Sequence, residues 1–322
     1  MPMLIRFSAD GRARLGLYRA GRYCDLTELD PLRFAGFPAA LRAAAAAAQP
    51  LEAVIEEAAT AAPADAWREA PAAWRAWLDA EGDALAASSS QPGGSEPLSL
   101  LCPVEPDEVW AAGVTYERSR DARVEEALVK DIYTRVYEAE RPELFLKATG
   151  ARVVGPGQPV RLRRDSSWMV PEPELGLVLD GAGAIAGFTI GNDMSARDIE
   201  GENPLYLPQA KVFRGACALG PAVALPHEIP DPYDLEIRCR IWRGDECVFD
   251  GAVNTARLKR TFEELIRYLG RDNPIFPGTV LLTGTGIVPP DAFTLHPGDV
   301  IDIAVPGLGV LCNPVAGPSD GG

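Results

Sequence analysis

The sequence predicts an α+β fold in which a smaller N-terminal α/β domain precedes a larger, mainly β domain. Alanine-rich runs typical of helices are confined to the first part of the chain, whereas short apolar patterns broken by Gly and Pro dominate the second part. Between them, the segment Ala87–Glu96 has the Ser-, Gly- and Pro-rich composition of a linker. A chain of 322 residues is long enough for two domains. We therefore expect domains at residues 1–95 and 96–322.

The N-terminal part begins with residues 3–28, where apolar stretches separated by Gly and Arg predict short strands. Alanine-rich segments then predict helices over residues 38–60 and 66–87, because Ala has the highest intrinsic helix propensity. No heptad of larger apolar residues persists along these segments, which argues against a coiled coil. These elements would make up the smaller domain.

The second part should consist of strands with few helices. Residues Trp110–Val114 predict a strand, and Arg118–Glu140 predicts a helix, because apolar side chains recur there at four-residue spacing. Thr261 and Glu264 form a capping box, which predicts a helix that ends at Gly270. Further strands are predicted at Leu235–Trp242, Cys247–Val253, Val280–Thr283 and Val300–Val305.

Two apolar segments around a Gly-containing turn predict a β-hairpin. The segments are Leu175–Asp180 and Ile185–Ile190, and four residues separate them. If the residues that flank the turn pair with each other, antiparallel counting places Glu172 opposite Asp193, while Glu172 and Glu174 share one face of their strand. A slip of one residue would instead turn Asp193 to the other face.

This register brings three carboxylates to the open end of the hairpin. Glu172, Glu174 and Asp193 would repel one another at cross-strand distance unless a cation held them together. An all-oxygen set that leaves coordination positions for water suits Mg²⁺, and also Mn²⁺ or Ca²⁺. The alternative is that the acids are solvated at strand ends, where Asp and Glu usually lie. Spacing alone leaves both interpretations open.

Several motifs occur in the order found in a known superfamily. These motifs are Glu172-x-Glu174, Asn192–Asp198, Lys211, Gly220-Pro221, Leu281–Thr285 and Pro297–Asp299. Together they resemble the fumarylacetoacetate hydrolase superfamily over roughly residues 100–315. Within it, Val170–Asp180 and Glu200–Gln209 are similar to the 2-keto-3-deoxy-D-arabinonate dehydratase branch. The resemblance implies a lyase with the superfamily's mixed β-sandwich roll, assembled as a homodimer or a dimer of dimers.

The resemblance also implies roles for individual residues. The metal ligands of the superfamily fall on Glu172, Glu174 and Asp193, which strengthens the metal interpretation. Its active-site lysine falls on Lys211. Glu143 matches the proposed acid/base of the dehydratase branch. The resemblance therefore implies a metal site with two proton-transferring side chains beside it.

Three further residues are expected at the substrate. Thr285 matches the position that holds the 2-oxo acid end of the substrate in the superfamily. Arg118 and Ser119 lie near the start of the helix predicted after the strand Trp110–Val114, where side chains can reach a substrate. Residues at a helix start also commonly cap the helix or contact solvent, so both interpretations of these two residues stay open.

The sequence departs from the C–C hydrolases of the superfamily in one respect. Those enzymes pair a His with a Glu to activate water, and the His lies in the segment that corresponds to Gly113–Arg123, which contains no His here. The only two histidines, His227 and His296, lie in predicted loops. A zinc or iron site built on imidazole is therefore not expected. Hydrolysis of an acylpyruvate C–C bond is disfavoured for the same reason.

The expected substrate is a 2-keto-3-deoxy sugar acid that binds the metal through its carboxylate and 2-oxo oxygens. A 2-keto-3-deoxy-pentonate carries a hydroxyl on C4, so removal of a C3 proton and loss of that hydroxyl lead, after tautomerisation, to 2-oxoglutarate semialdehyde. Glu143 and Lys211 would share the proton transfers, and a non-covalent role for Lys211 is favoured over a Schiff base. The alternatives are acylpyruvate hydrolysis, decarboxylation of a 2-oxo diacid, and, in a different class, binding of a sugar acid without catalysis.

Composition narrows the partners and the compartment. The formal net charge of −15 argues against nucleic acid and anionic membranes, which both attract basic surfaces. The N-terminus lacks the pattern of a secretory leader, and no apolar stretch approaches the ~20 residues that a membrane span requires. Six scattered cysteines without a Cys-x-x-Cys pair indicate reduced thiols. We therefore expect a cytoplasmic enzyme.

Overall fold

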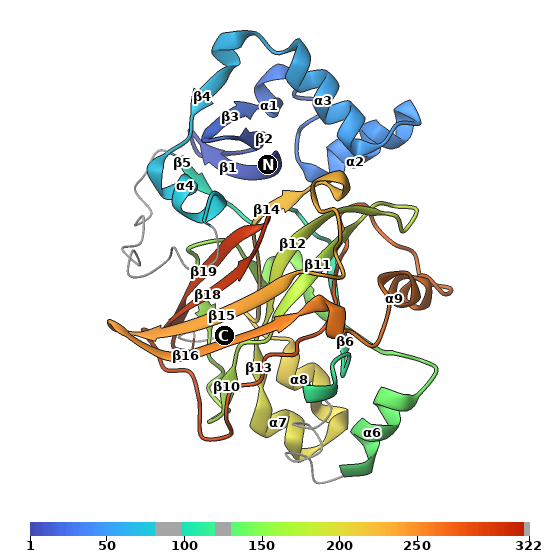
Figure 1. The fold of residues 1–322 in the computed structure, drawn as a ribbon, viewed down its shortest axis with the longest axis vertical. Helices are drawn as coiled ribbons and strands as arrows, with labels where there is room; N and C mark the ends of the chain where they lie inside the picture. The colour runs from blue at the N-terminus through green and yellow to red at the C-terminus, as the bar shows by residue number, and fades with distance from the viewer. Residues whose placement is uncertain (81–97, 120–129, 319–322) are drawn as a thin grey trace.

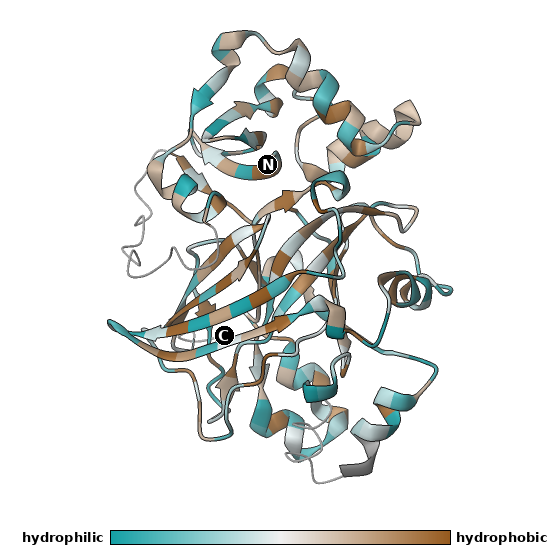
Figure 2. Ribbon diagram, viewed as in Figure 1, coloured by the Kyte–Doolittle hydropathy of each residue, from teal (hydrophilic) through white to brown (hydrophobic). Residues whose placement is uncertain are grey.

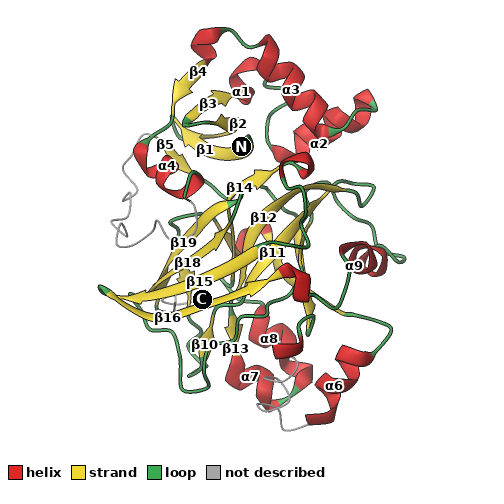
Figure 3. Ribbon diagram, viewed as in Figure 1, coloured by secondary structure: helices red, strands yellow, loops and turns green. Residues whose placement is uncertain are grey.

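The computed structural model describes residues 1–80, 98–119 and 130–318 (Figure 1). The predicted linker, and the part of the predicted helix Arg118–Glu140 at residues 120–129, lie outside the described residues. Strands fill the middle of the molecule, and most helices lie at its two ends (Figure 3). This combination of a β-rich centre and peripheral helices confirms the predicted α+β class.

The helices and strands follow the chain in three groups. The first is β1 (Met3–Ala9), β2 (Arg12–Arg19), β3 (Arg22–Asp25), α1 (Leu26–Leu29), α2 (Phe37–Ala47), α3 (Leu51–Ala61), β4 (Trp67–Glu69) and α4 (Ala72–Leu78). The second is β5 (Leu98–Leu100), β6 (Glu108–Gly113), α6 (Lys130–Glu138), β7 (Glu143–Thr149), β8 (Val153–Val154), β9 (Val160–Arg161), β10 (Met169–Val170), β11 (Pro173–Leu179) and β12 (Ile185–Asp193). The third is β13 (Ser195–Ala196), α7 (Arg197–Glu202), α8 (Leu207–Lys211), β14 (Cys217–Ala224), β15 (Glu236–Arg243), β16 (Glu246–Asn254), α9 (Phe262–Leu269), β17 (Val280–Leu282), β18 (Val300–Val305) and β19 (Gly309–Ala316).

Two large sheets share one hydrophobic core. The first runs β4-β3-β2-β1-β14-β12-β11-β17-β6-β7, with β5 on β1 and β8 on β14, and the second runs β16-β15-β18-β19-β9. β14 contacts β19, and β11 contacts β15. The cluster that joins them takes fully buried side chains from both sheets, including Leu177, Ile190, Ile241 and Ile303. Apolar residues accordingly concentrate on the central strands (Figure 2), where their burial drives folding.

The N-terminal strands extend the larger sheet. β1 pairs antiparallel with β2 along its whole length; on its other edge it pairs with β14, with Met3 opposite Ala224, and then with β5. The first strand of the chain is therefore hydrogen-bonded to a strand more than 200 residues away. The division into domains at residues 1–95 and 96–322 remains a prediction.

The two predicted alanine-rich helices differ from the structure in their limits. The helix predicted over residues 38–60 is two helices, α2 and α3, because Ala48 adopts a left-handed conformation and Pro50 cannot lie inside a helix. The helix predicted over residues 66–87 is wrong at Trp67–Glu69, which form strand β4 paired with β3. Only the short helix α4 follows before the described residues end. A helix-ending residue, a proline and strand pairing thus override the intrinsic helix propensity of alanine here.

The predicted hairpin is formed by β11 and β12, and the register at its open end is confirmed. The Asp193 amide donates to the Glu172 carbonyl at 2.9 Å, so these residues lie opposite each other as predicted. At the closed end a β-bulge makes Leu179 pair with Ile185, so the turn is one residue longer than predicted. Because the bulge lies at the turn, it leaves the register of the acidic residues unchanged.

The remaining elements of the second part agree closely with the sequence patterns. Five predicted strands appear as β6, β15, β16, β17 and β18, whereas several others, among them β7, β14 and β19, were not predicted. The side chain of Thr261 accepts a hydrogen bond from the Glu264 amide at 3.2 Å and begins α9, which ends before Gly270. The predicted helix Arg118–Glu140 is helical at Glu117–Ser119 and in α6. No helix in the described part of the chain is both long and apolar enough to cross a membrane.

Candidate metal centre

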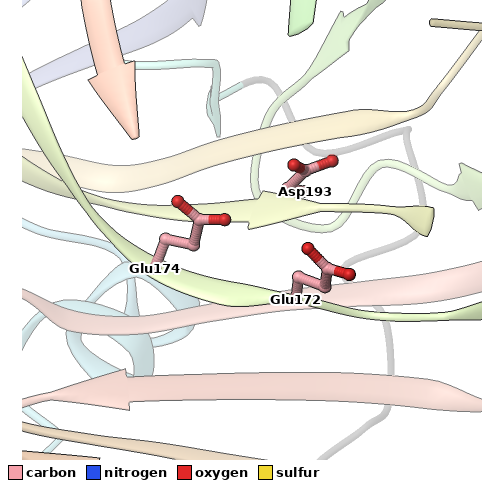
Figure 4. Close-up of side chains that lie close together, drawn as sticks. All are labelled: Glu172, Glu174 and Asp193. Carbon is pink, nitrogen blue, oxygen red and sulfur yellow. The ribbon is translucent and has the colours of Figure 1, made fainter. Parts of the chain in front are cut away.

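Three buried carboxylates meet at the open end of the β11–β12 hairpin. Glu174 lies on β11, Glu172 lies just before it, and Asp193 ends β12; Figure 4 shows their carboxylates gathered around one space. One ligand oxygen of each lies within 4.8 Å of those of the others. Glu172 is 4 % exposed, and Glu174 and Asp193 are each 1 % exposed. The alternative of solvated acids at strand ends is therefore wrong, and the donor set is that of a hard divalent cation.

Lys211 and Arg197 reach this triad of carboxylates from α8 and α7. Lys211 Nζ lies 2.7 Å from Glu172 Oε2 and 3.2 Å from Asp193 Oδ2. Arg197 Nη2 lies 3.2 Å from Glu172 Oε1. Both cations are buried. The structure thus brings Lys211 to the triad as expected, and it adds an arginine that stands in the Asn192–Asp198 motif but was given no role from the sequence.

A second lysine, Lys147 of β7, contacts the other oxygen of Asp193. Lys147 is 0 % exposed, and its Nζ lies 2.5 Å from Asp193 Oδ1 in an ion pair without the directionality of a hydrogen bond. It also donates to the carbonyls of Met194 at 2.8 Å and Lys211 at 2.5 Å. Lys147 therefore ties β7 to the end of β12 and to α8. Sequence reasoning missed it, and the only signal was a lysine inside the apolar run Leu144–Ala148.

The backbone after β17 holds Glu174. The Gly284 amide donates to Glu174 Oε2 at 2.5 Å, and Gly284 has a φ of 94°, which favours glycine. A Cβ at this position would lie 1.9 Å from Thr115 Oγ1, so the close approach also requires glycine. The Thr115 hydroxyl donates to the Thr283 carbonyl at 2.7 Å. This buried hydrogen bond fixes the turn that presents the Gly284 amide to the triad.

Electrostatics at the triad favour a bound cation. Burial raises the pKa of Glu174 well above its ordinary value, and the carboxylates of Asp193 and Glu172 raise it further, while the Gly284 amide and Lys211 lower it. A divalent ion at the triad would favour the ionised form of Glu174 and so oppose this shift. The buried oxygen ligands and their mutual repulsion thus fit a divalent metal ion.

Glu143 begins β7 and lies opposite Gly113, the last residue of β6. Its carboxylate lies so close to the Gly113 backbone that a Cβ there would be 2.1 Å from Glu143 Oε2, so glycine makes room for it. Lys211 Nζ lies 5.7 Å from the ring centroid of Phe145, two residues further along β7. The two predicted proton-transferring residues therefore lie beside the same strand.

One of the three predicted substrate-binding residues, Arg118, lines a pocket. Thr285 is buried directly after the glycine that binds the triad, and its Oγ1 accepts a hydrogen bond from the Ile287 amide at 3.1 Å. Ser119 is buried, whereas Arg118 is exposed and donates to the Val288 carbonyl at 3.3 Å. Arg118, Ile287 and Val288 line a pocket of about 900 Å³. These positions leave the substrate-binding roles of Thr285, Ser119 and Arg118 as predictions.

Tyr116 lines the same pocket and was missed by sequence reasoning. It is 2 % exposed, and its hydroxyl has no hydrogen-bond partner among the described residues. Burial raises its pKa, and the nearby charge of Glu174 raises it further. Buried hydroxyls without a partner are uncommon in folded proteins and are often found at functional sites. Nothing in the sequence distinguished this tyrosine from a core residue.

The histidines and cysteines lie outside the triad. His227 Nδ1 lies 2.9 Å from Glu52 Oε2, and the His227 side chain is 43 % exposed. His296 is exposed before a turn. Both therefore lie at the surface, as predicted. All six cysteines are free thiols.

Comparison with known proteins identifies close relatives. A family model described as fumarylacetoacetate hydrolase C-terminal matches residues 109–316. The probable 2-keto-3-deoxyxylonate dehydratase of Haloferax volcanii is 50 % identical over 213 residues, which cover 66 % of this chain and 73 % of that protein. The 2-dehydro-3-deoxy-D-arabinonate dehydratase of Saccharolobus solfataricus is 49 % identical over 222 residues, covering 68 % and 74 %.

Solved structures extend the similarity to nearly the whole chain. A 2-keto-3-deoxy-D-arabinonate dehydratase complexed with magnesium and 2,5-dioxopentanoate has a TM-score of 0.77 and 36 % identity, covering 99 % of this chain and 100 % of that chain. A fumarylacetoacetate hydrolase from Exiguobacterium antarcticum, with a TM-score of 0.69 at 22 % identity, shares the fold. The fold type that the motifs implied is confirmed. This chain belongs to the fumarylacetoacetate hydrolase family.

Proposed function

We propose that this protein is a metal-dependent hydro-lyase that removes water from a 2-keto-3-deoxy-pentonate to give 2-oxoglutarate semialdehyde. The observation that carries the proposal is the buried triad of carboxylates with Lys211 in contact with two of them. The two curated relatives are named as dehydratases of such acids. The solved relative holds 2,5-dioxopentanoate, which is the same compound as 2-oxoglutarate semialdehyde.

Mg²⁺ is the proposed cofactor, with Glu172, Glu174 and Asp193 as its ligands. The buried oxygen donors and the magnesium in the solved relative support this assignment. When bound, the ion would polarise the 2-oxo group of the substrate and acidify the C3 protons. The formal charges of the three carboxylates are balanced by two lysines and one arginine in contact with them. A divalent ion would therefore leave the site positive, which favours an anionic substrate in an acidic protein.

Glu143 and Lys211 are proposed to share the proton transfers. One of them takes a proton from C3, and a proton is delivered to the C4 hydroxyl, which leaves as water with the electrons of the C4–O bond. The new C3–C4 double bond then moves to C4–C5 as a proton leaves C5 and one returns to C3, and the resulting enol becomes the aldehyde. Glu143 lies on β7, and Lys211 Nζ lies 5.7 Å from the ring of Phe145 on the same strand, which supports a shared role at one substrate.

The remaining assignments follow the family resemblance. Thr285 is proposed to hold the 2-oxo acid end of the substrate. Arg118, which lines the pocket, and Ser119, which follows it in the chain, are proposed to contact the other end. The proposed binding partner is a small 2-keto-3-deoxy sugar acid. The net charge of −15 argues against a nucleic acid or a membrane as a partner. A homodimer or a dimer of dimers and a cytoplasmic location complete the proposal.

Hydrolysis of an acylpyruvate is the main alternative on the same metal site. It requires a base that activates water, and the described segment after β6, Val114–Ser119, supplies no histidine for that role. Decarboxylation of a 2-oxo diacid would need only the metal, and no contact of the site favours it over dehydration. Binding without catalysis is disfavoured by the presence of Lys211 at the triad.

Product analysis tests the proposal. The purified protein with Mg²⁺ would be incubated separately with 2-keto-3-deoxy-D-arabinonate, its L isomer, an acylpyruvate and oxaloacetate, and the products followed by mass spectrometry. Loss of one water from a keto-deoxy acid is the expected result. Cleavage of the acylpyruvate alone, loss of CO₂ alone, or no reaction with any of them would contradict it.

A further inference from the structure

The loop between α6 and β7 leads directly to Glu143. Residues 139–141 of this loop are exposed, and Glu143 is the first residue of β7. Its pairing with Gly113 is the last pair between β7 and β6. The sheet therefore holds the Glu143 backbone on its C-terminal side, whereas the loop before it determines how the chain enters the strand.

The described part of α6 has a small apolar anchor. The cluster beneath it contains two buried residues, Val114 and Tyr133, with Val136 and Tyr137 partly buried against them. Because hydrophobic stabilisation is roughly proportional to the apolar area buried, so small a cluster holds the helix weakly. The last carbonyls of a helix also lack partners within that helix. Polar contacts at the C-terminal end of α6 should therefore decide how firmly the loop before Glu143 is held.

Arg260 binds the backbone of this loop. Its Nη1 donates to the Glu140 carbonyl at 3.1 Å, and its Nη2 donates to the Ala139 carbonyl. Arg260 is 8 % exposed, and its Nη1 also lies 2.8 Å from Oε1 of Glu264 on α9. A cation at the C-terminus of a helix also interacts favourably with the helix dipole. One buried guanidinium thus joins the end of α6 to the first turn of α9.

Neighbouring contacts support the same junction. The Lys259 amide donates to the Thr115 carbonyl at 3.0 Å, and the Lys259 ammonium donates to the Tyr137 carbonyl. The Tyr268 hydroxyl donates to Glu140 Oε1 at 3.3 Å. Thr115 in turn bonds to the turn after β17 that contacts the triad. The segment that holds the loop is therefore itself anchored beside the metal site.

We propose that Arg260 is a positioning residue for Glu143: it fixes the loop before β7 and so holds the Glu143 carboxylate where proton transfer takes place. Arg260 binds the carbonyl of Glu140, three residues before Glu143 in the chain. A displacement of about 1 Å at a reacting group can lower a rate by about 10²-fold. This inference deepens the proposed function, because it rests on the role of Glu143 as an acid or base.

Loss of Arg260 should loosen the loop without unfolding the protein. Ala139 and Glu140 are exposed, so water can bind the carbonyls that Arg260 releases. The Glu264 side chain is 23 % exposed and can be hydrated as well. Two variants grade the loss: Arg260→Met removes the charge and every donor, whereas Arg260→Lys keeps the charge but lacks the planar fork that reaches two carbonyls and a carboxylate together.

Amide hydrogen exchange measures the hold on the loop without reference to activity. Exchange would be followed by mass spectrometry in the wild type and in both Arg260 variants. We expect the first amides of β7, residues 143–146, to exchange at least about tenfold faster in Arg260→Met and to a smaller extent faster in Arg260→Lys. Residues 172–193, which form the triad hairpin, should keep their wild-type rates. Unchanged exchange at residues 143–146 in both variants would overturn the proposal.

A double-mutant cycle with Glu143→Gln tests the consequence for catalysis. Arg260→Met alone should lower kcat about tenfold or more and leave the Kd for Mg²⁺ within about twofold of the wild-type value. In the Glu143→Gln background the same change should lower kcat less than about twofold, because the group that Arg260 positions is already absent. An equal fall in both backgrounds, or a wild-type kcat in Arg260→Met, would contradict the positioning role.

Arg243→Met is the matched control. Arg243, the last residue of β15, also pairs with a carboxylate, that of Asp299 at 2.8 Å, and donates to a backbone carbonyl, that of Thr294 at 3.2 Å. Its removal should leave kcat and the exchange at residues 143–146 at their wild-type values. A wild-type protein without dehydratase activity would contradict the proposed function, and the exchange measurement would still decide whether Arg260 holds the loop before Glu143.

Discussion

Replacing Glu143 by Gln isolates its part in proton transfer. Gln has nearly the same shape as Glu. Gly113, where a Cβ would lie 2.1 Å from Glu143 Oε2, leaves the same room for it. Loss of one general acid or base lowers turnover by about 10² to 10⁴, or about 2.7 to 5.4 kcal/mol of transition-state stabilisation. We expect kcat to fall by that factor.

The assay separates this role from metal binding. Initial rates of product formation would be measured with saturating Mg²⁺, and the Kd for Mg²⁺ would be measured by calorimetry. Glu143 lies on β7 and outside the triad, so the Kd should change by less than about threefold. Glu236→Gln, at the exposed first residue of β15, is the control and should match wild type in both measurements.

Hydrogen exchange between the substrate and the solvent then shows which of Glu143 and Lys211 takes the C3 proton. In D₂O, a Glu143→Gln variant that still exchanges the C3 protons of the substrate would assign C3 deprotonation to Lys211 and the leaving hydroxyl to Glu143, whereas loss of exchange would assign the C3 proton to Glu143. Turnover of the variant above about one tenth of wild type would refute the reasoning altogether.

Three further predictions concern the triad and the pocket. Glu172→Gln should abolish metal-dependent turnover and weaken Mg²⁺ binding by at least about tenfold while the circular dichroism spectrum is unchanged; full activity in this variant would contradict the ligand assignment. Because the folded pKa of Glu174 is raised, the metal-free protein holds that proton more tightly than the unfolded chain, so its free energy of unfolding should fall as the pH rises from the ordinary range of Glu through the raised pKa. Urea unfolding at several pH values should show this slope, and Glu174→Gln should remove that part of it. Tyr116→Phe removes a buried hydroxyl without a partner, so its Tm should equal or exceed that of wild type while kcat/KM falls about tenfold or more; a lower Tm with normal kcat/KM would indicate a structural role.

The triad could be predicted because it is local. Its three members belong to one hairpin, so strand alternation and antiparallel counting were enough to place Glu172 opposite Asp193. The β-bulge at Leu179 could have shifted that register, but it lies at the turn. Position along a hairpin is therefore accessible from sequence when irregularities occur beyond the residues of interest.

The partners of the triad could not be predicted because they come from distant segments. Lys147 lies 46 residues before Asp193, and the Gly284 amide lies 110 residues after Glu174. Their approach depends on the order of strands in the larger sheet, where β17 lies between β11 and β6. Local patterns do not specify that order. A lysine within an apolar strand could have been noticed in the sequence, whereas a backbone amide carries no sequence signal.

The N-terminal helices show how far intrinsic helix propensity alone can predict structure. Alanine content predicted two long helices, but Pro50 divides the first, and the second gives way to β4 because Trp67–Glu69 pair with β3. Proline is a local signal and could have been weighed against alanine. The pairing of β4 is a tertiary interaction that overrides intrinsic preference, as is common for short strands.

Simultaneous titration of binding and turnover tests the central claim, that dehydration depends on one ion held by the triad. Chelator-treated protein would be titrated with Mg²⁺, and occupancy by calorimetry would be compared with the rate of water loss from 2-keto-3-deoxy-D-arabinonate on the same preparation. We predict one ion per chain and a rate proportional to occupancy. Full turnover in the metal-free protein, or a rate that saturates while the site is still mostly empty, would contradict the claim.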